Sequence, residues 1–232
     1  GWLTATVAVE VLDWERPDVV LQRDFTAEDL AGWDQHGLPL SRIVEVEGET
    51  VLSLEGDGVY RDGMVSRDHF RLTEGGRIEL VFRLELNRTD RQRIRLCLEP
   101  TEEPEEPFPA DSIGWPQSLV YCLLYPVGEQ SKFNSGQLLI TNDQLILQDY
   151  VDLPEDLDTR EWTQFALEIQ PDGQVGLYVN GEFWQTVDVP IDIEPHRFWH
   201  IQLSGASVET ELHVRSLTVY SGGGVADPPP GV

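Results

Sequence analysis

The stretch Trp162–Val187, WTQFALEIQPDGQVGLYVNGEFWQTV, decides the fold class of this chain. Apolar residues alternate with polar ones on both sides of two short turns, and this is the periodicity of half-buried strands. Asn180-Gly181 supplies the two residues of positive φ that a type I′ hairpin requires. The stretch therefore predicts three antiparallel strands, with Pro171–Gly173 as the first turn. We interpret its alternation as core packing, which would make these strands scaffold.

The same alternation recurs along the whole chain. Arg77–Leu86 is the clearest example, with apolar residues on one face and charged residues on the other. Phe25–Trp33 predicts a one-turn helix capped by Thr26. Further strands are predicted at Leu3–Val11, Arg42–Val46, Thr50–Leu54, Gln92–Leu98, Leu119–Tyr125, Gln137–Thr141, Gln144–Gln148, Arg197–Leu203 and Glu211–Tyr220, the last with a bulge at Arg215-Ser216. About a dozen strands and hardly any helix predict an all-β fold of two antiparallel sheets packed face to face.

One domain accounts for most of the chain. We expect a single β-sandwich over residues 1–221 and a Gly/Pro-rich linker or tail over 222–232. Between two predicted strands, residues 99–115 are rich in Pro and Glu. Such a segment predicts a long loop, and loops of this length in compact domains are usually functional or mobile.

The charge balance limits the possible partners. Forty-two acidic residues against sixteen basic ones give a formal net charge of −26. Such a surface repels nucleic acid and anionic membranes, so neither is expected as a partner. The sequence has no apolar run long enough for a transmembrane helix, and it begins at Gly1. We expect an extracellular or periplasmic domain of a larger protein, tethered to a membrane or signalling domain outside this fragment.

Two cysteines, Cys97 and Cys122, fall in the middle of predicted strands. If those strands pair, a cross-strand disulfide could form in an oxidising compartment. Two free buried thiols are the alternative, and the sequence leaves both open. Their spacing does not fit a zinc site.

Two segments resemble the concanavalin A-like lectin/glucanase superfamily. The first, FTAEDLAGW followed by a hairpin and RIELVFRLEL, resembles the opening of 3-keto-disaccharide hydrolase-like domains. The second, the quoted Trp162–Val187 stretch closing with ELHVRSLTVY, resembles laminin G-like domains. The resemblance implies a curved two-sheet jelly roll with a concave face. The superfamily includes hydrolases, lectins and adhesion modules, so the fold alone does not give the function.

The sequence favours binding over catalysis. Glucanases of this fold carry Glu-x-Asp-x-x-Glu on one strand, because hydrolysis with retention needs two carboxyl groups on one face. That motif is missing, and the best-matching strand, LVYCLLY at 119–125, has no carboxylate. Glu79 and Glu85 alternate with arginines, which predicts ion pairing. We therefore expect a non-catalytic module that binds a carbohydrate or another polar small ligand. A glycoside hydrolase with an unconventional site and a protein-interaction module remain alternatives.

The resemblance also suggests where a ligand would bind. If the apolar positions of 94–98 face the core, the intervening ones face the concave surface, with Arg83 beside them on the preceding strand. Loops would add aromatic and imidazole groups at the rim. The predicted ligand-binding residues are Arg83, Arg93, Arg95, Trp33, His36, Trp115 and Phe133. Alternatively, the two tryptophans close the edges of the sandwich.

No cofactor is expected, although calcium is a feature of the superfamily. Asp57, Asp62 and Asp68 provide hard oxygen donors in one glycine-rich loop, and a second acidic cluster lies at 149–158. Neither matches an EF-hand, and clusters of this kind arise by chance in so acidic a chain. The three aspartates are thus weak candidates for a metal site.

Overall fold

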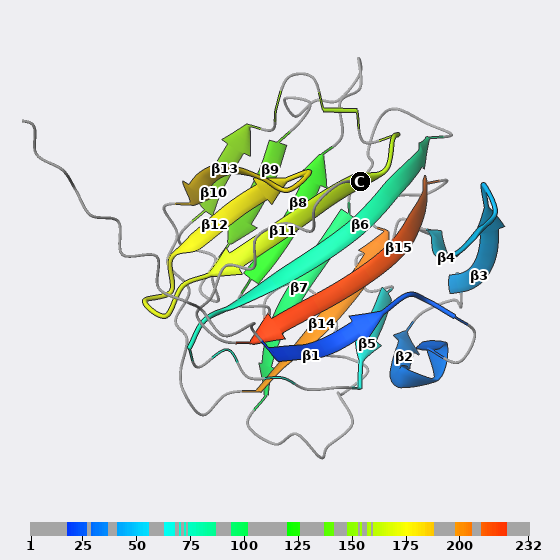
Figure 1. The fold of residues 1–232 in the computed structure, drawn as a ribbon, viewed down its shortest axis with the longest axis horizontal. Coiled ribbons are helices and arrows are strands. Elements are labelled where there is room, and N and C mark those ends of the chain that lie inside the picture. Colours follow the sequence, from blue (N-terminus) through cyan, green and yellow to red (C-terminus); the bar gives the residue numbers. More distant parts are fainter. Residues whose placement is uncertain are drawn as a thin grey trace, which may run out of the picture.

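A computed structural model describes residues 18–26, 29–36, 41–55, 63–67, 70, 72, 74–86, 94–101, 120–125, 137–141, 148–152, 154, 157–158, 160–187, 198–205 and 210–221. These residues form two antiparallel sheets that lie one behind the other (Figure 1). The predicted all-β, two-sheet sandwich is therefore confirmed. The predicted strand at Leu3–Val11 lies outside the described residues, as does most of the loop at 99–115.

The first sheet has eight strands and lies in front in Figure 1. Its order is β13 (Glu182–Val187), β12 (Val175–Val179), β11 (Thr163–Ile169), β6 (Gly76–Leu86), β15 (Thr210–Ser221), β4 (Glu49–Glu55) and β3 (Ser41–Val46), and β1 (Asp18–Arg23) also pairs with β15. The quoted Trp162–Val187 stretch thus forms one end of this sheet. Its last strand, β13, is the edge strand.

The second sheet has seven strands. Its order is β10 (Gln148–Asp152), β9 (Gln137–Thr141), β8 (Val120–Tyr125), β7 (Ile94–Thr101), β14 (Phe198–Gly205), β5 (Gly63–Ser66) and β2 (Trp33–His36), the last directly preceded by the 3-10 helix η1 (Asp29–Gly32). The chain therefore passes from one sheet to the other between β6 and β7. That crossover determines which predicted site residues can meet.

The core lies between the two sheets. On β6 the alternate residues Ile78, Leu80, Phe82 and Leu84 are at most 2% exposed, as the periodicity predicts. They belong to one hydrophobic cluster with residues of β11, β12, β14 and β15. Because these inner positions form the core, charged residues of β6 are placed on the outer face of the first sheet.

A bulge in β15 keeps that strand in phase with the core. The pairing of β15 with β6 shifts between Val214 and Ser216, so Arg215 is the extra residue. Without it, strict alternation could not place both Val214 and Leu217 inward, yet both are fully buried. The bulge predicted at Arg215-Ser216 is confirmed.

The predicted tight turns are also present. Asn180 and Gly181 have φ values of 51° and 81°, and Glu47 and Gly48 have 56° and 85°, as type I′ hairpins require. The strand predicted at Gln144–Gln148 lies outside the described residues except for Gln148, which is the first residue of β10. Among the described residues, no helix is long and apolar enough to cross a membrane.

Candidate functional site

Strand register creates a row of side chains across the outer face of the first sheet. Thr186 on β13 pairs with Gly176 on β12, which lies opposite Glu168 on β11. Glu168 lies opposite Arg77 on β6, and Arg77 lies opposite Tyr220 on β15. Directly opposed residues of antiparallel strands share one face. Five strands therefore bring these five residues together, although they are far apart in the sequence.

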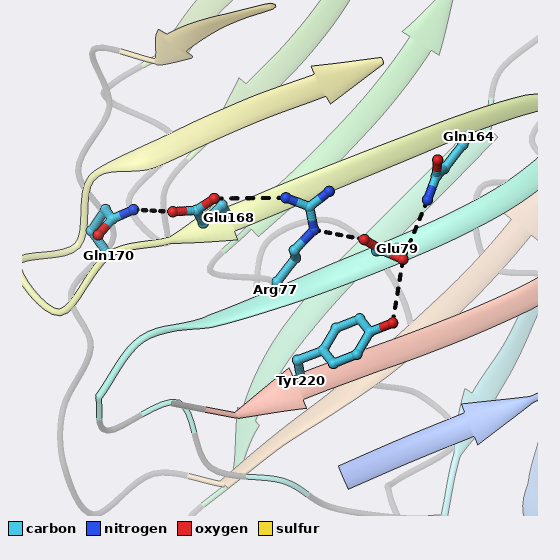
Figure 2. A network of polar contacts seen from close by, with 6 residues as sticks. All are labelled: Arg77, Glu79, Gln164, Glu168, Gln170 and Tyr220. Carbon is cyan, nitrogen blue, oxygen red and sulfur yellow. Dashed lines mark hydrogen bonds and ion pairs between the residues drawn. The ribbon is translucent and has the colours of Figure 1, made fainter. Parts of the chain in front are cut away.

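Arg77 is the centre of a buried charge network, shown in Figure 2. Its Nε lies 2.7 Å from Glu79 Oε1, and its Nη1 lies 3.7 Å from Glu168 Oε2 (Figure 2). Glu79 also accepts hydrogen bonds from Gln164 and Tyr220. The side chains of Arg77, Glu79 and Glu168 are only 3%, 13% and 9% exposed. The ion pairing predicted for Glu79 is confirmed.

A hollow opens beside this network, between the outer faces of β11, β12 and β13. It has a volume of about 500 Å³. We call it the Glu168 hollow, and its lining residues are Glu168, Gln170, Pro171, Asp172, Gln174, Gly176, Tyr178, Phe183 and Thr186. Gly176 is part of this lining: a Cβ there would make van der Waals contact with the Tyr178 ring at 3.5 Å, the Phe183 ring at 3.6 Å and Glu168 Cβ at 3.8 Å.

Two aromatic rings line the hollow. Tyr178 and Phe183 meet edge to face, with ring centroids 5.4 Å apart. Phe183 is 57% exposed, because it stands on the edge strand. The Arg77 guanidinium lies 4.3 Å from the centroid of the Tyr178 ring. Burial raises the pKa of Tyr178 to about 12, and the nearby Glu168 carboxylate adds to the shift, so the phenol is neutral at physiological pH.

Glu168 brings an incompletely paired carboxylate to the hollow. Its Oε1 accepts a hydrogen bond from the Gln170 side chain. Its Oε2 accepts none within the described part of the chain, although the residue is only 7% exposed. The nearest guanidinium, that of Arg77, lies closer to Glu79 than to Glu168. A buried carboxylate oxygen without a hydrogen bond gains from any donor that enters the hollow.

A second, smaller hollow lies beside the same edge strand. It measures about 380 Å³, and its lining includes Trp184, which is 42% exposed, and Trp162. The Trp162 ring lies 5.2 Å from the Arg83 guanidinium and 4.1 Å from that of Arg215. Arg83 also binds Glu47 at 2.7 Å. That ion pair and hydrogen bond hold the pKa of Glu47 below its usual value.

The predicted grouping of Arg83 with Arg95 was wrong. Arg83 is on β6 of the first sheet, whereas Arg95 is on β7 of the second sheet, opposite Ser204 of β14. Consecutive strands resemble one another in sequence, but here the connection crosses between the sheets. Arg83 instead pairs with Glu47 and lies against Trp162, which gives it a structural role.

Trp33 was also wrongly predicted as a residue of the groove rim. It is 3% exposed and belongs to the hydrophobic core, with its ring centroid 6.0 Å from that of Phe25. An indole buried to this extent cannot contact a ligand. The alternative, that it closes the sandwich, agrees with the structure.

The remaining predicted residues stay untested. His36 lies at the end of β2, opposite Gly63. Cys122 lies opposite Leu96, so it is not directly opposed to Cys97, although β7 and β8 do pair. Residues outside the described part are Arg93, Trp115, Phe133, Asp57, Asp62 and Asp68. Within the described part, no group of three or more His, Cys, Asp or Glu side chains is placed to hold a metal ion.

One further polar cluster contains a serine, a histidine and a glutamate. Glu211 Oε1 accepts hydrogen bonds from Ser53 Oγ and from Arg42, and it lies 3.0 Å from His213 Nε2. In a hydrolase triad the serine hydroxyl contacts the histidine, and the carboxylate supports the histidine from the other side. Here the carboxylate occupies the middle position, and Ser53 is fully buried. This arrangement does not activate a nucleophile.

The Glu168 hollow was not predicted, because the stretch that contains it was interpreted as scaffold. The inner face of the stretch does pack in the core, where Phe165, Leu167 and Ile169 are buried. The other face of the same strands carries the hollow. A signal was present in β13, where Phe183 and Trp184 are adjacent, so alternation can bury only one of them.

Comparisons with known proteins show the fold. No family model matches the chain, and no curated protein matches it. Among solved structures it resembles the globular domain of T. cruzi calreticulin, at 12% identity and a TM-score of 0.57, over 90% of this chain and 89% of that one. It also resembles a carbohydrate esterase from the Shiga toxin-encoding bacteriophage phi24B, at 12% identity and a TM-score of 0.56, over 89% and 99% of the two chains.

A third similar structure is the binding domain of botulinum neurotoxin DC, solved with rat synaptotagmin II. The identity is 10% and the TM-score 0.54. The match covers 84% of this chain, which spans 44% of the length of the neurotoxin chain. At such low identities the likeness concerns the fold alone. The chain is an all-β sandwich of two antiparallel sheets, and its fold is similar to that of these proteins.

Proposed function

We propose that this chain is a non-catalytic binding module and that a carbohydrate binds in the Glu168 hollow. One observation carries the proposal: the exposed Phe183 ring lines the same hollow as Glu168, whose buried carboxylate oxygen Oε2 accepts no hydrogen bond in the described part of the chain. Sugars are bound by aromatic rings that cover their C–H faces and by a few polar groups that take their hydroxyl groups. Phe183 supplies the aromatic ring, and Glu168 supplies a polar group that can accept a hydrogen bond from a hydroxyl.

The surrounding residues fit the same ligand class. Gln170, Gln174 and Thr186 add amide and hydroxyl groups at the rim. The hollow, at about 500 Å³, is within the usual range for small-molecule sites. Its walls come from three hydrogen-bonded strands, so much of the site exists before the ligand arrives.

The structural comparisons add support at the level of the fold. One similar structure, at 10% identity and a TM-score of 0.54, is described as a botulinum neurotoxin type C whose cell entry depends on two ganglioside molecules. Another is the phage carbohydrate esterase. The sequence resemblance to laminin G-like and 3-keto-disaccharide hydrolase-like domains points to the same ligand class. We further propose that the module works outside the cytoplasm, as the sensor or targeting part of a larger protein, and binds without a cofactor.

Phe183→Ala and a matched control, Val19→Ala, test the proposal. Both residues are exposed apolar side chains on strands of the first sheet, at 57% and 51%, but Val19 is on β1, and the Glu168 hollow does not include it. A glycan array and calorimetry on the best ligand would measure binding. We expect Phe183→Ala to weaken it by about tenfold or more, because stacking on an aromatic ring is lost, and Val19→Ala to leave it unchanged. Equal affinities for both variants, or silence across the array, would overturn the proposal.

A further inference from the structure

We propose that the Glu168 hollow selects a sugar that carries a protonated amine, such as a hexosamine unit with a free amino group. This inference rests on the proposed function and names the class of ligand for the same site. It begins with the charges around Arg77 (Figure 2). One guanidinium faces two carboxylates, those of Glu79 and Glu168, and it is 2.7 Å from the first but 3.7 Å from the second. The network therefore carries an excess negative charge on the Glu168 side.

The position of that charge makes it available to a ligand. Glu168 lines the hollow and is only 7% exposed. Its Oε2 accepts no hydrogen bond within the described residues. Gly176 has no side chain to cover it. Asp172, at the rim, adds a second carboxylate. An ammonium group placed here would both donate a hydrogen bond and compensate the charge, and bonds between charged groups are the stronger ones.

The aromatic rings favour the same ligand. The face of an aromatic ring attracts cations, and the Tyr178 ring already holds the Arg77 guanidinium at 4.3 Å. Tyr178 and Phe183 contact each other and line the same hollow as Glu168. A ligand amine beside Glu168 would therefore lie close to ring surface as well as to negative charge.

The charge argument also ranks the competing ligands. A neutral sugar can donate a hydroxyl hydrogen bond to Glu168, but it leaves the excess charge uncompensated. An anionic sugar meets Glu168 and Asp172 in the hollow and a chain of net charge −26 around it. The order of affinity that we expect is amino sugar, then neutral sugar, then acidic sugar.

Two probes, one with free amines and one with acetylated amines, test the first step of this order. Glucosamine tetramer and N-acetylglucosamine tetramer have the same sugar backbone, but only the first is cationic at pH 6. Calorimetry should show about tenfold or more tighter binding of the first. Because a polyanionic protein also attracts cations non-specifically, the titration is repeated at high salt, where exposed charges are screened.

Three variants assign the preference to the hollow. Glu168→Gln keeps the shape and removes the charge, so it should abolish the preference for the amine. Glu45→Gln removes one carboxylate from β3 at the far end of the sheet and should preserve it. Gly176→Leu fills the hollow without a change of charge and should remove binding of both tetramers. This variant still tests the site if Glu168→Gln is poorly folded.

The results separate failure of the amine preference alone from failure of the proposed function. Equal binding of the two tetramers in the wild-type protein, both lost in Gly176→Leu, would overturn the amine preference and leave the proposed function standing. A preference that survives Glu168→Gln and Gly176→Leu would come from the general surface charge, and it would also overturn the inference. If neither tetramer nor any neutral glycan binds, both the amine preference and the proposed function are overturned.

Discussion

Replacement of Arg77 by Met should be among the most damaging single changes on the outer face of the first sheet. The substitution keeps a long side chain but leaves the carboxylates of Glu79 and Glu168 without their cation. These carboxylates are only 13% and 9% exposed, so solvent compensates them poorly. Loss of one partner from a buried ion pair costs about 3–5 kcal/mol. That is a large fraction of the roughly 5–15 kcal/mol by which domains are typically stable.

Urea unfolding followed by tryptophan fluorescence would measure the loss. Arg160→Met is the matched control, because Arg160 and its partner Asp158 are 65% and 42% exposed, and such pairs contribute about 1 kcal/mol or less. The double variant Arg77→Met/Glu168→Gln should recover part of the stability, since it removes one of the two buried charges. If Arg77→Met costs no more than Arg160→Met, or if the double variant recovers nothing, the buried network does not stabilise the sheet as argued.

Three further predictions concern other parts of the first sheet. Gly75→Ala should cost about 2–4 kcal/mol in urea unfolding, because φ is 85° there and a Cβ would lie 2.4 Å from the Ile169 carbonyl oxygen; a loss under about 1 kcal/mol would contradict this. Burial raises the pKa of Glu211, but hydrogen bonds from Ser53, His213 and Arg42 outweigh it and hold that pKa below its ordinary value of 4.5. The resulting stability is present above pH 4.5 and lost as pH falls through the lower folded pKa, so Glu211→Gln should flatten the acid side of the stability profile, and an unchanged profile would refute this. Since the pKa of Tyr178 is about 12, Tyr178→Phe should remove a tyrosinate absorbance step near that pH, and persistence of the whole step would count against the assignment.

Local features of the fold were predictable from the sequence. Asn180-Gly181 needs two residues of positive φ, and few residue pairs adopt that conformation easily, so the hairpin follows from the pair itself. The alternation on β6 likewise determines which face is buried, because a shift of one residue would expose Ile78 and its apolar neighbours. These signals depend on residues close together in the chain.

The candidate site depends on pairings between distant segments, and alternation carries no information about those. Nothing in β6 or β7 indicates that the connection between them crosses to the other sheet, so Arg83 and Arg95 could not be separated by sequence alone. The contact of Arg77 with Glu168 likewise exists only because β6 pairs with β11 in one particular register. Trp33 follows a glycine in an apparent loop, and its burial depends on packing with Phe25 and the rest of the core.

The claim that ligand binds in the Glu168 hollow is tested most directly by NMR mapping of backbone amide shifts during titration with glucosamine tetramer. We predict that the largest shifts fall on Glu168, Gly176 and Phe183, which are on three adjacent strands of the first sheet. The strands of the second sheet around Arg95 and Ser204 should stay unchanged. Saturable shifts on the second sheet, with the three hollow residues silent, would contradict the account and move the binding site to β7 and β14.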